Sequence, residues 1–194
     1  MRFVDKNNII INRELSDLDR FTLDFIKVLE KYSEYVLVSG YVAILLGRAR
    51  ISEDVDVIIP KIKAKVFDKL YVDIKNHNFY CLNTEESSDV FEYLEEGLAV
   101  RFAYAGTIIP NVELKWVKHR FDQLTFEKAL TVKLGTDHLR ISNLELQIAF
   151  KEEVLKSPKD VEDADHIREV AKTYLDNGLI QKYKEMLHEF YSGK

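Results

Sequence analysis

Residues 35–60, YVLVSGYVAILLGRARISEDVDVIIP, carry the pattern that decides the fold. The apolar run at 35–38 predicts a buried strand, and Ser39-Gly40 interrupts it before residues 41–46 continue as a short apolar helix. A polar loop follows, and the alternation over 53–59 predicts a second strand that Pro60 closes. The stretch therefore predicts the order strand, turn, helix, loop, strand.

The segments on either side add helices and short strands. Apolar residues spaced by three and four predict helices at 15–32 and 62–76. Period-two alternation predicts a strand at 111–117, with Glu113 and Lys115 on one face and apolar residues on the other. Further short strands are expected at 79–82, 98–104, 130–134 and 138–141.

The chain changes character after residue 141. Ser142 and Glu145 suggest a capping box for one helix, Ser157-Pro158 begins a second, and a third follows Asn177-Gly178. We therefore expect an α/β (α+β) fold. A core with a mixed β-sheet flanked by helices would cover residues 1–141, and a helical segment over 142–194 would pack on it.

Composition sets limits on the function. The chain has 194 residues, 46% of them hydrophobic and 31% charged, with a formal net charge of −5. This composition indicates a globular protein without the basic footprint of a protein that grips long nucleic acid, although a polymer substrate is neither indicated nor excluded. Cys81 is the only cysteine, which excludes an intrachain disulfide. Without a signal-peptide pattern or a membrane-length apolar run, we expect a cytoplasmic protein with no membrane anchor.

Three carboxylates are the candidate chemical groups. Asp54 and Asp56 are two residues apart in a predicted strand, so both leave the same face of the sheet. Paired hard oxygens suit Mg²⁺, which takes one or two carboxylates and completes its shell with water and phosphate. If the strand of Glu113 neighbours theirs, Glu113 faces the aspartates as a general base or a ligand of a second metal ion.

The Ser39-Gly40 turn is the candidate phosphate site, because it presents free backbone N–H groups at the start of a helix. Each feature alone has an ordinary explanation, since Asp-x-Asp pairs are more often solvated strand faces and Ser-Gly is common turn chemistry. Their combination in one order favours a nucleotide site. Serine suits this turn if its φ is negative, whereas a strained backbone would weaken the case for triphosphate binding.

The stretch VLVSGYVAILLGRARISEDVDVII resembles the nucleotidyltransferase superfamily with the DNA polymerase β fold. It is most similar to the small bacterial and archaeal branch of minimal nucleotidyltransferases and abortive-infection toxins. In that branch a Gly-Gly or Gly-Ser turn leads to Gly-Arg-x-Arg-x-Ser/Thr-x-Asp-x-Asp. The motif positions here are Gly47, Arg48, Arg50, Ser52, Asp54 and Asp56.

The tail of the chain extends the resemblance, because the branch carries a Lys on one helix and Lys-Asp near the start of the next. Lys151 in LQIAFKEEV and Lys159-Asp160 in SPKDVEDAD match these positions. The resemblance implies that both lysines contact phosphate or nucleotide and that Asp160 positions a neighbour. Acids such as Asp160 and Asp163 also suit the first turn of a helix without any function.

The resemblance implies an enzyme that transfers a nucleoside monophosphate from a nucleoside triphosphate to an acceptor hydroxyl. The metal ligands would be Asp54, Asp56 and Glu113, holding one or two Mg²⁺ ions, with Mn²⁺ as a substitute. The nucleotide would contact Ser39, Gly40, Arg50, Ser52, Lys151 and Lys159. The acceptor stays open between RNA, protein and a small molecule. The alternative is a weak or inactive member of the same fold that binds nucleotide or a protein partner, such as an antitoxin.

Overall fold

The computed structural model describes residues 1–192. Its contacts group the chain into two compact units, each built from separate segments. Unit 1 comprises Met1–Arg13, Val38–Arg50 and the residues from Glu127 onward, and unit 2 comprises Glu14–Leu37 and Ile51–Phe126. This grouping differs from the sequence-based division at residue 141, which stays a prediction.

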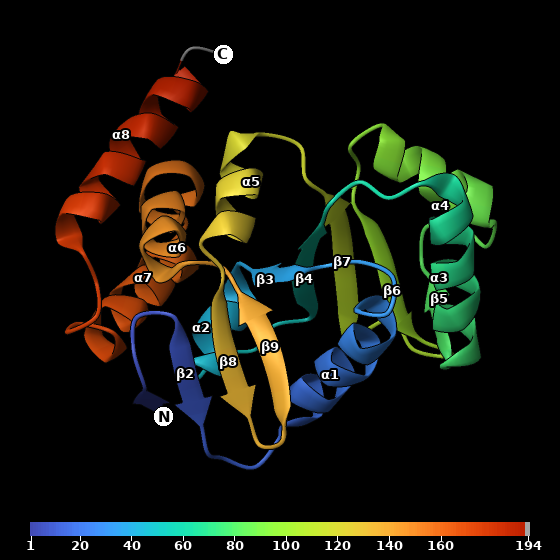
Figure 1. The fold of residues 1–194 in the computed structure, drawn as a ribbon, viewed down its shortest axis with the longest axis horizontal. Helices are drawn as coiled ribbons and strands as arrows, with labels where there is room; N and C mark the ends of the chain where they lie inside the picture. Colours follow the sequence, from blue (N-terminus) through green and yellow to red (C-terminus); the bar gives the residue numbers. More distant parts are fainter. Residues whose placement is uncertain (193–194) are drawn as a thin grey trace. The chain divides into compact units, whose positions relative to one another are not determined.

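Unit 2 is a mixed sheet covered by helices, and its strands lie in the order β3, β4, β7, β6, β5. Strands β4 and β7 are parallel, whereas β6 is antiparallel to both β7 and β5. The strand bounds are β3 Val36–Val38, β4 Asp54–Ile59, β5 Phe79–Cys81, β6 Val100–Tyr104 and β7 Asn111–Trp116. The helices are α1 Asp17–Leu29, α3 Ala64–Asn76, α4 Ser87–Glu95 and α5 Arg120–Glu127, and α3 contacts both α1 and α4 (Figure 1).

Helix α1 shows why these residues form these elements. Ser16 accepts a hydrogen bond from the Asp19 backbone N–H at 3.1 Å, and the Asp19 carboxylate accepts one from the Ser16 backbone N–H at 2.8 Å. This capping box satisfies donors that the first turn cannot pair internally. The apolar face of α1 then places Phe21 and Phe25 against the ring of Phe79, so the helix is anchored in the core of unit 2.

Unit 1 combines a sheet in the order β1, β2, β8, β9 with a group of helices. Strand β2 pairs antiparallel with β1 and parallel with β8, and β8 and β9 form an antiparallel hairpin. The strand bounds are β1 Arg2–Phe3, β2 Asn8–Ile11, β8 Leu130–Leu134 and β9 Asp137–Ile141. The helices are α2 Gly40–Leu45, α6 Leu144–Phe150, α7 Pro158–Val170 and α8 Asn177–Ser192, with a π-helical turn, η1, at Lys151–Leu155. Helices α6, α7 and α8 lie together (Figure 1), and each of them contacts η1.

Two details of unit 1 differ from the sequence-based expectation. The cap of α6 is Asn143, whose side-chain oxygen accepts the Leu146 N–H at 2.8 Å, while Ser142 accepts a hydrogen bond from Gln147. The strands β1 and β2 were not expected, because β2 is a four-residue element flanked by polar residues. Within residues 1–192, the helices are too short or too polar to cross a membrane.

Glu152 ties the C-terminal helices together and gives unit 1 a pH dependence. Its carboxylate accepts hydrogen bonds from Arg168 at 2.8 and 3.0 Å and from Lys184 at 3.1 Å. Burial alone raises the pKa of Glu152, but these two cations outweigh burial and lower the pKa below its ordinary value of 4.5. The ionised carboxylate therefore stabilises the fold above pH 4.5, and this stabilisation is lost as the pH falls through the folded-state pKa.

We expect Glu152→Gln to lower the free energy of unfolding at pH 7 by roughly 1 kcal/mol, a value reduced by solvent screening of the partly exposed partners. Urea denaturation at several pH values measures this. The difference from the wild type should disappear well below pH 4.5, because both proteins are then uncharged at this position. Glu169→Gln, an exposed position on the same helix as Arg168, should show no such difference. A pH-independent difference would contradict the ionic explanation.

Candidate functional site

The predicted carboxylates share one face of the sheet in unit 2. Strands β4 and β7 are parallel neighbours, and their register pairs Asp56 with Glu113 and Asp54 with Asn111. Val55 and Val112 point to the opposite face and are fully buried. The condition for Glu113 to face the two aspartates, that its strand neighbours theirs, is therefore met.

Two cationic side chains bind the carboxylates on this face of the sheet. The ammonium of Lys115 lies 3.0 Å from Asp56 Oδ1 and 2.6 Å from Glu113 Oε1, so it bridges the two strands. The other oxygen of Glu113, Oε2, accepts hydrogen bonds from Arg101 Nε at 3.1 Å and Nη2 at 3.0 Å. Both oxygens of Glu113 are therefore bonded to cations.

The pKa values of these groups show how strongly charge is concentrated here. Burial raises the pKa of Asp56, and the positive charge of Lys115 only partly offsets this effect. Burial alone would also raise the pKa of Glu113, but Lys115 and Arg101 together lower it. The pKa of Lys115 is raised, because the Asp56 and Glu113 carboxylates outweigh the effect of its own burial. A cation on this face is thus favoured, and a lysine supplies one.

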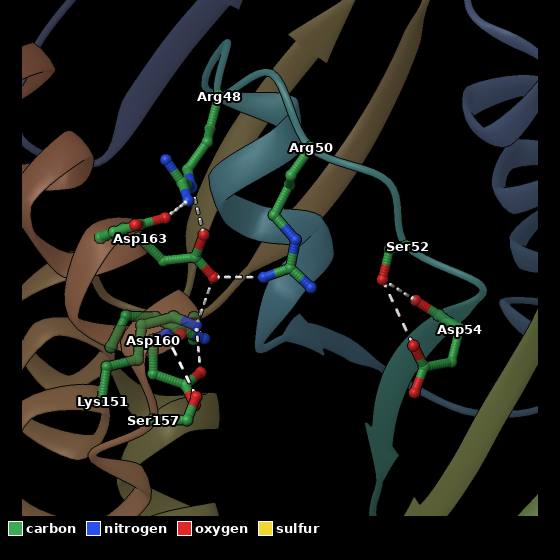
Figure 2. Close-up of polar contacts among 11 residues, drawn as sticks. Arg48, Arg50, Ser52, Asp54, Lys151, Ser157, Asp160 and Asp163 are labelled. Carbon is green, nitrogen blue, oxygen red and sulfur yellow. Dashed lines mark hydrogen bonds and ion pairs between the residues drawn. The ribbon is translucent and has the colours of Figure 1, made fainter.

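Asp54 has a different environment from Asp56. The Ser52 hydroxyl lies 3.3 Å from Asp54 Oδ1 and 3.1 Å from the Asp54 carbonyl oxygen (Figure 2). Across residues 1–192, the structure gives Asp54 no ion-pair partner. The side-chain oxygen of Asn111, opposite Asp54 in the register, is buried and accepts no hydrogen bond from the described residues.

The carboxylate and amide oxygens on this face are of the chemical type that binds a hard divalent cation such as Mg²⁺. These oxygens do not by themselves form a complete metal coordination site. Among the described residues, no three His, Cys, Asp or Glu side chains are gathered closely enough to hold a metal ion. Between Asp56 and Glu113, the position of a bridging cation is taken by Lys115.

The predicted phosphate turn lies in unit 1, and its first residue has a strained backbone. Ser39 has φ 64° and ψ −135°, and its side chain makes no hydrogen bond that caps α2. A side chain with a Cβ rarely adopts this region, which glycine enters without cost. The negative φ that would suit serine at this turn is therefore not present.

We expect Ser39→Gly to raise the free energy of unfolding by about 1 kcal/mol, because it removes the clash of the Cβ with the backbone. Chemical denaturation of the two proteins measures the change. Asn78→Gly is the matched control. Asn78 also has a positive φ, of 66°, but asparagine tolerates the left-handed region, so a much smaller gain is expected. A variant Ser39→Gly no more stable than the wild type would show that the serine is not strained.

Gly40 leaves room for the side chain of Arg50. A Cβ placed on Gly40 would lie 2.8 Å from Nη2 of Arg50 and 3.2 Å from its Cζ. The guanidinium of Arg50 therefore lies directly against the backbone at the start of α2. This arrangement places a planar, permanently charged donor group at the predicted phosphate turn.

A buried carboxylate holds Arg50 in that position. Asp163, on α7, is fully buried, and its two oxygens accept from Arg48 Nε at 2.7 Å, Arg50 Nη1 at 2.6 Å and Lys151 Nζ at 2.9 Å (Figure 2). Lys151 also bonds Asp160 Oδ1 at 3.2 Å. We name these five residues, Arg48, Arg50, Lys151, Asp160 and Asp163, the Asp163 cluster.

The structure places the predicted lysines of the tail differently from each other. Lys151 is only 1% exposed, and its ammonium is bonded to two carboxylates of the Asp163 cluster. Lys159 is exposed on the first turn of α7. Asp160 accepts a hydrogen bond from the hydroxyl of Ser157, the residue that caps the same helix.

Sequence reasoning did not identify three of the residues that shape these sites. Lys115 was placed on the same strand face as Glu113, but its bridging role depends on the β4–β7 register. Arg101 requires the antiparallel register that pairs it with Glu113. Asp163 was assigned only to the first turn of a helix, and its partners Arg48 and Arg50 lie more than a hundred positions earlier in the chain.

Comparison with known proteins supports one conclusion about the fold. No protein-family model and no curated protein sequence matches the chain. Among solved structures, the chain is similar to an antigenic nucleotidyltransferase-like protein from Paracoccidioides brasiliensis, with a TM-score of 0.52, 16% identity and coverage of 90% of this chain and 89% of that one. It is also similar to the antibiotic-resistance factor ANT(2'')-Ia, with a TM-score of 0.54, 13% identity and coverage of 92% and 96%. The chain therefore has the nucleotidyltransferase-like α/β fold that its sequence resembles.

Proposed function

We propose that the protein is a Mg²⁺-dependent nucleotidyltransferase that transfers a nucleoside monophosphate from a nucleoside triphosphate to an acceptor hydroxyl. The observation that carries this proposal is the register of β4 and β7, which sets Asp56 opposite Glu113 and puts the three carboxylates on one face. Asp54 and Asp56 would hold the metal ion, and Mn²⁺ would substitute for Mg²⁺. When bound, the ion supplies positive charge that neutralises the triphosphate and the leaving pyrophosphate.

The phosphates are assigned to the Ser39-Gly40 turn and to Arg50. The backbone N–H groups that open α2 have no partners within the helix, which suits them to bind an anion. Arg50 lies against Gly40 and offers charge-assisted hydrogen bonds, while Asp163 fixes its orientation. Asp163 is therefore proposed as a positioning residue.

The remaining predicted residues take smaller roles in the proposal. Ser52 would orient Asp54 through its hydroxyl. Lys159 is exposed and would contact the nucleotide directly. Lys151 is buried and bonded to two carboxylates, so we propose that it acts by holding Asp163.

Glu113 would activate the acceptor hydroxyl or complete a second metal site. The transfer reaction itself tests this role of Glu113. Purified protein is incubated with each labelled nucleoside triphosphate, Mg²⁺ and cell extract, and labelled RNA, protein and small molecules are separated. The wild type should label one acceptor class, and chelation of the metal should abolish the signal.

For Glu113→Gln we expect labelling to fall at least about 100-fold, the range in which an acid or base group contributes to catalysis. Glu92→Gln, an exposed glutamate on α4, is the matched control and should keep the wild-type rate. Equal labelling by Glu113→Gln and the wild type would overturn the role of Glu113. Absence of labelled product with every triphosphate would overturn the transferase proposal.

A second candidate is a protein of the same fold that binds nucleotide or a protein partner without transfer, such as a toxin–antitoxin component. The strained Ser39 and the complete pairing of Glu113 with cations favour it. This candidate predicts Mg²⁺-dependent binding of a triphosphate in calorimetry together with no labelled acceptor.

A further inference from the structure

The position of Lys115 bears on how many metal ions the acidic face accepts. Its ammonium touches one oxygen of Asp56 and one of Glu113, which come from neighbouring parallel strands. A cation that joined these two carboxylates would have to lie in this same place. The lysine and such an ion carry like charges, so they exclude each other.

The other oxygens show which part of the face stays open. Both oxygens of Glu113 are already bonded to a cation of the protein, Oε1 to Lys115 and Oε2 to Arg101. Asp56 uses only Oδ1 for Lys115, and Asp54 bonds only to Ser52 in the part of the chain that the structure describes. Two acidic groups therefore stay available to an external ion, and both belong to β4.

Burial does not force Lys115 into this position. Its side chain is 41% exposed, while the carboxylates that it bridges are 16% and 13% exposed. Lys115 is half-buried, and the attraction of two less exposed carboxylates holds its ammonium between them. The strand alternation that points Glu113 to this face also points Lys115 to it.

We propose that Lys115 is a built-in cation that replaces one of two divalent ions, so that the site binds a single metal ion, on Asp54 and Asp56. This inference rests on the proposed function for the identity of the metal site. It adds that Glu113 is bonded to Lys115 and Arg101 in place of a second ion. The protein's own side chain thus fixes the metal stoichiometry.

Titration with Mn²⁺ alone tests this, with the free ion followed by its electron paramagnetic resonance signal and no nucleotide present. The wild type should bind one Mn²⁺ per chain, and Lys115→Met should bind two, because it frees the oxygens between Asp56 and Glu113. Lys115→Arg keeps the charge and should still bind one. Lys69→Met removes the charge of an exposed lysine on α3 and should match the wild type.

Two ions bound by the wild type would overturn the inference, and this result needs no variant to fold. One ion bound by a Lys115→Met protein that melts cooperatively would overturn it as well. Failure of the proposed function is a separate result, namely the absence of labelled acceptor. A second Mn²⁺ gained by Lys115→Met supports the built-in cation even if no transfer is found.

Discussion

Replacing Asp163 with alanine should lower the free energy of unfolding by about 3 kcal/mol, the lower end of the range for breaking a buried ion pair. Asp163 is fully buried and accepts hydrogen bonds from Arg48, Arg50 and Lys151. Its removal leaves the buried ammonium of Lys151 with the carboxylate of Asp160 as its remaining partner within the Asp163 cluster. Uncompensated buried charge is far more costly than the loss of one surface hydrogen bond.

Chemical denaturation measures this change, and Asp165→Ala is the matched control. Asp165 lies on the same helix, α7, but is exposed, so its replacement should change stability by no more than about 0.5 kcal/mol. A double-mutant cycle with Lys151→Met isolates the coupling, because removing both buried partners should cost less than the sum of the single changes. A loss below 1 kcal/mol for Asp163→Ala, in the same range as the control, would contradict the central role given to this carboxylate.

The elements that the sequence predicted best are those with strong local signals. Apolar residues spaced by three and four predicted a helix at 15–32, which the structure places at Asp17–Leu29, and the alternation over 53–59 predicted β4. The alternation over 111–117 placed Glu113 on the polar face of its strand, and the register of β4 and β7 sets this face beside the two aspartates. These signals depend on neighbours along the chain, so a single sequence is sufficient to read them.

The features that the sequence did not reveal depend on distant partners. The Asp163 cluster joins α7 to the loop that follows α2, and no periodicity links positions so far apart. Strand β2 has four residues, and its pairing with β8 makes it a strand. The strain at Ser39 is a backbone property that residue types suggest but do not determine. Tertiary contacts therefore determine these three features, which the local sequence pattern does not specify.

Replacing both Asp54 and Asp56 with alanine should abolish Mg²⁺-dependent binding of the triphosphate. In the proposed function these two carboxylates hold the ion that neutralises the phosphates, and they are the acids on this face with oxygens that Lys115 and Arg101 leave open. Titration calorimetry of a nucleoside triphosphate with and without Mg²⁺ measures this. The wild type should give a saturable heat only with Mg²⁺, and the double variant should give none in either condition.

The control for this experiment must remove the same charge without touching β4. Glu92→Ala with Glu96→Ala does so, since both glutamates are exposed, Glu92 within α4 and Glu96 at its C-cap, and this variant should bind as the wild type does. Removing two acids from any surface weakens the general attraction for cations. Equal losses of binding in both double variants would therefore show that net charge causes the effect, and not a site on β4. Equal affinity of the wild type and the Asp54, Asp56 variant would show that these aspartates are a solvated strand face. A loss confined to the β4 variant would instead locate metal-dependent binding on the strand that the Asp-x-Asp pattern first indicated.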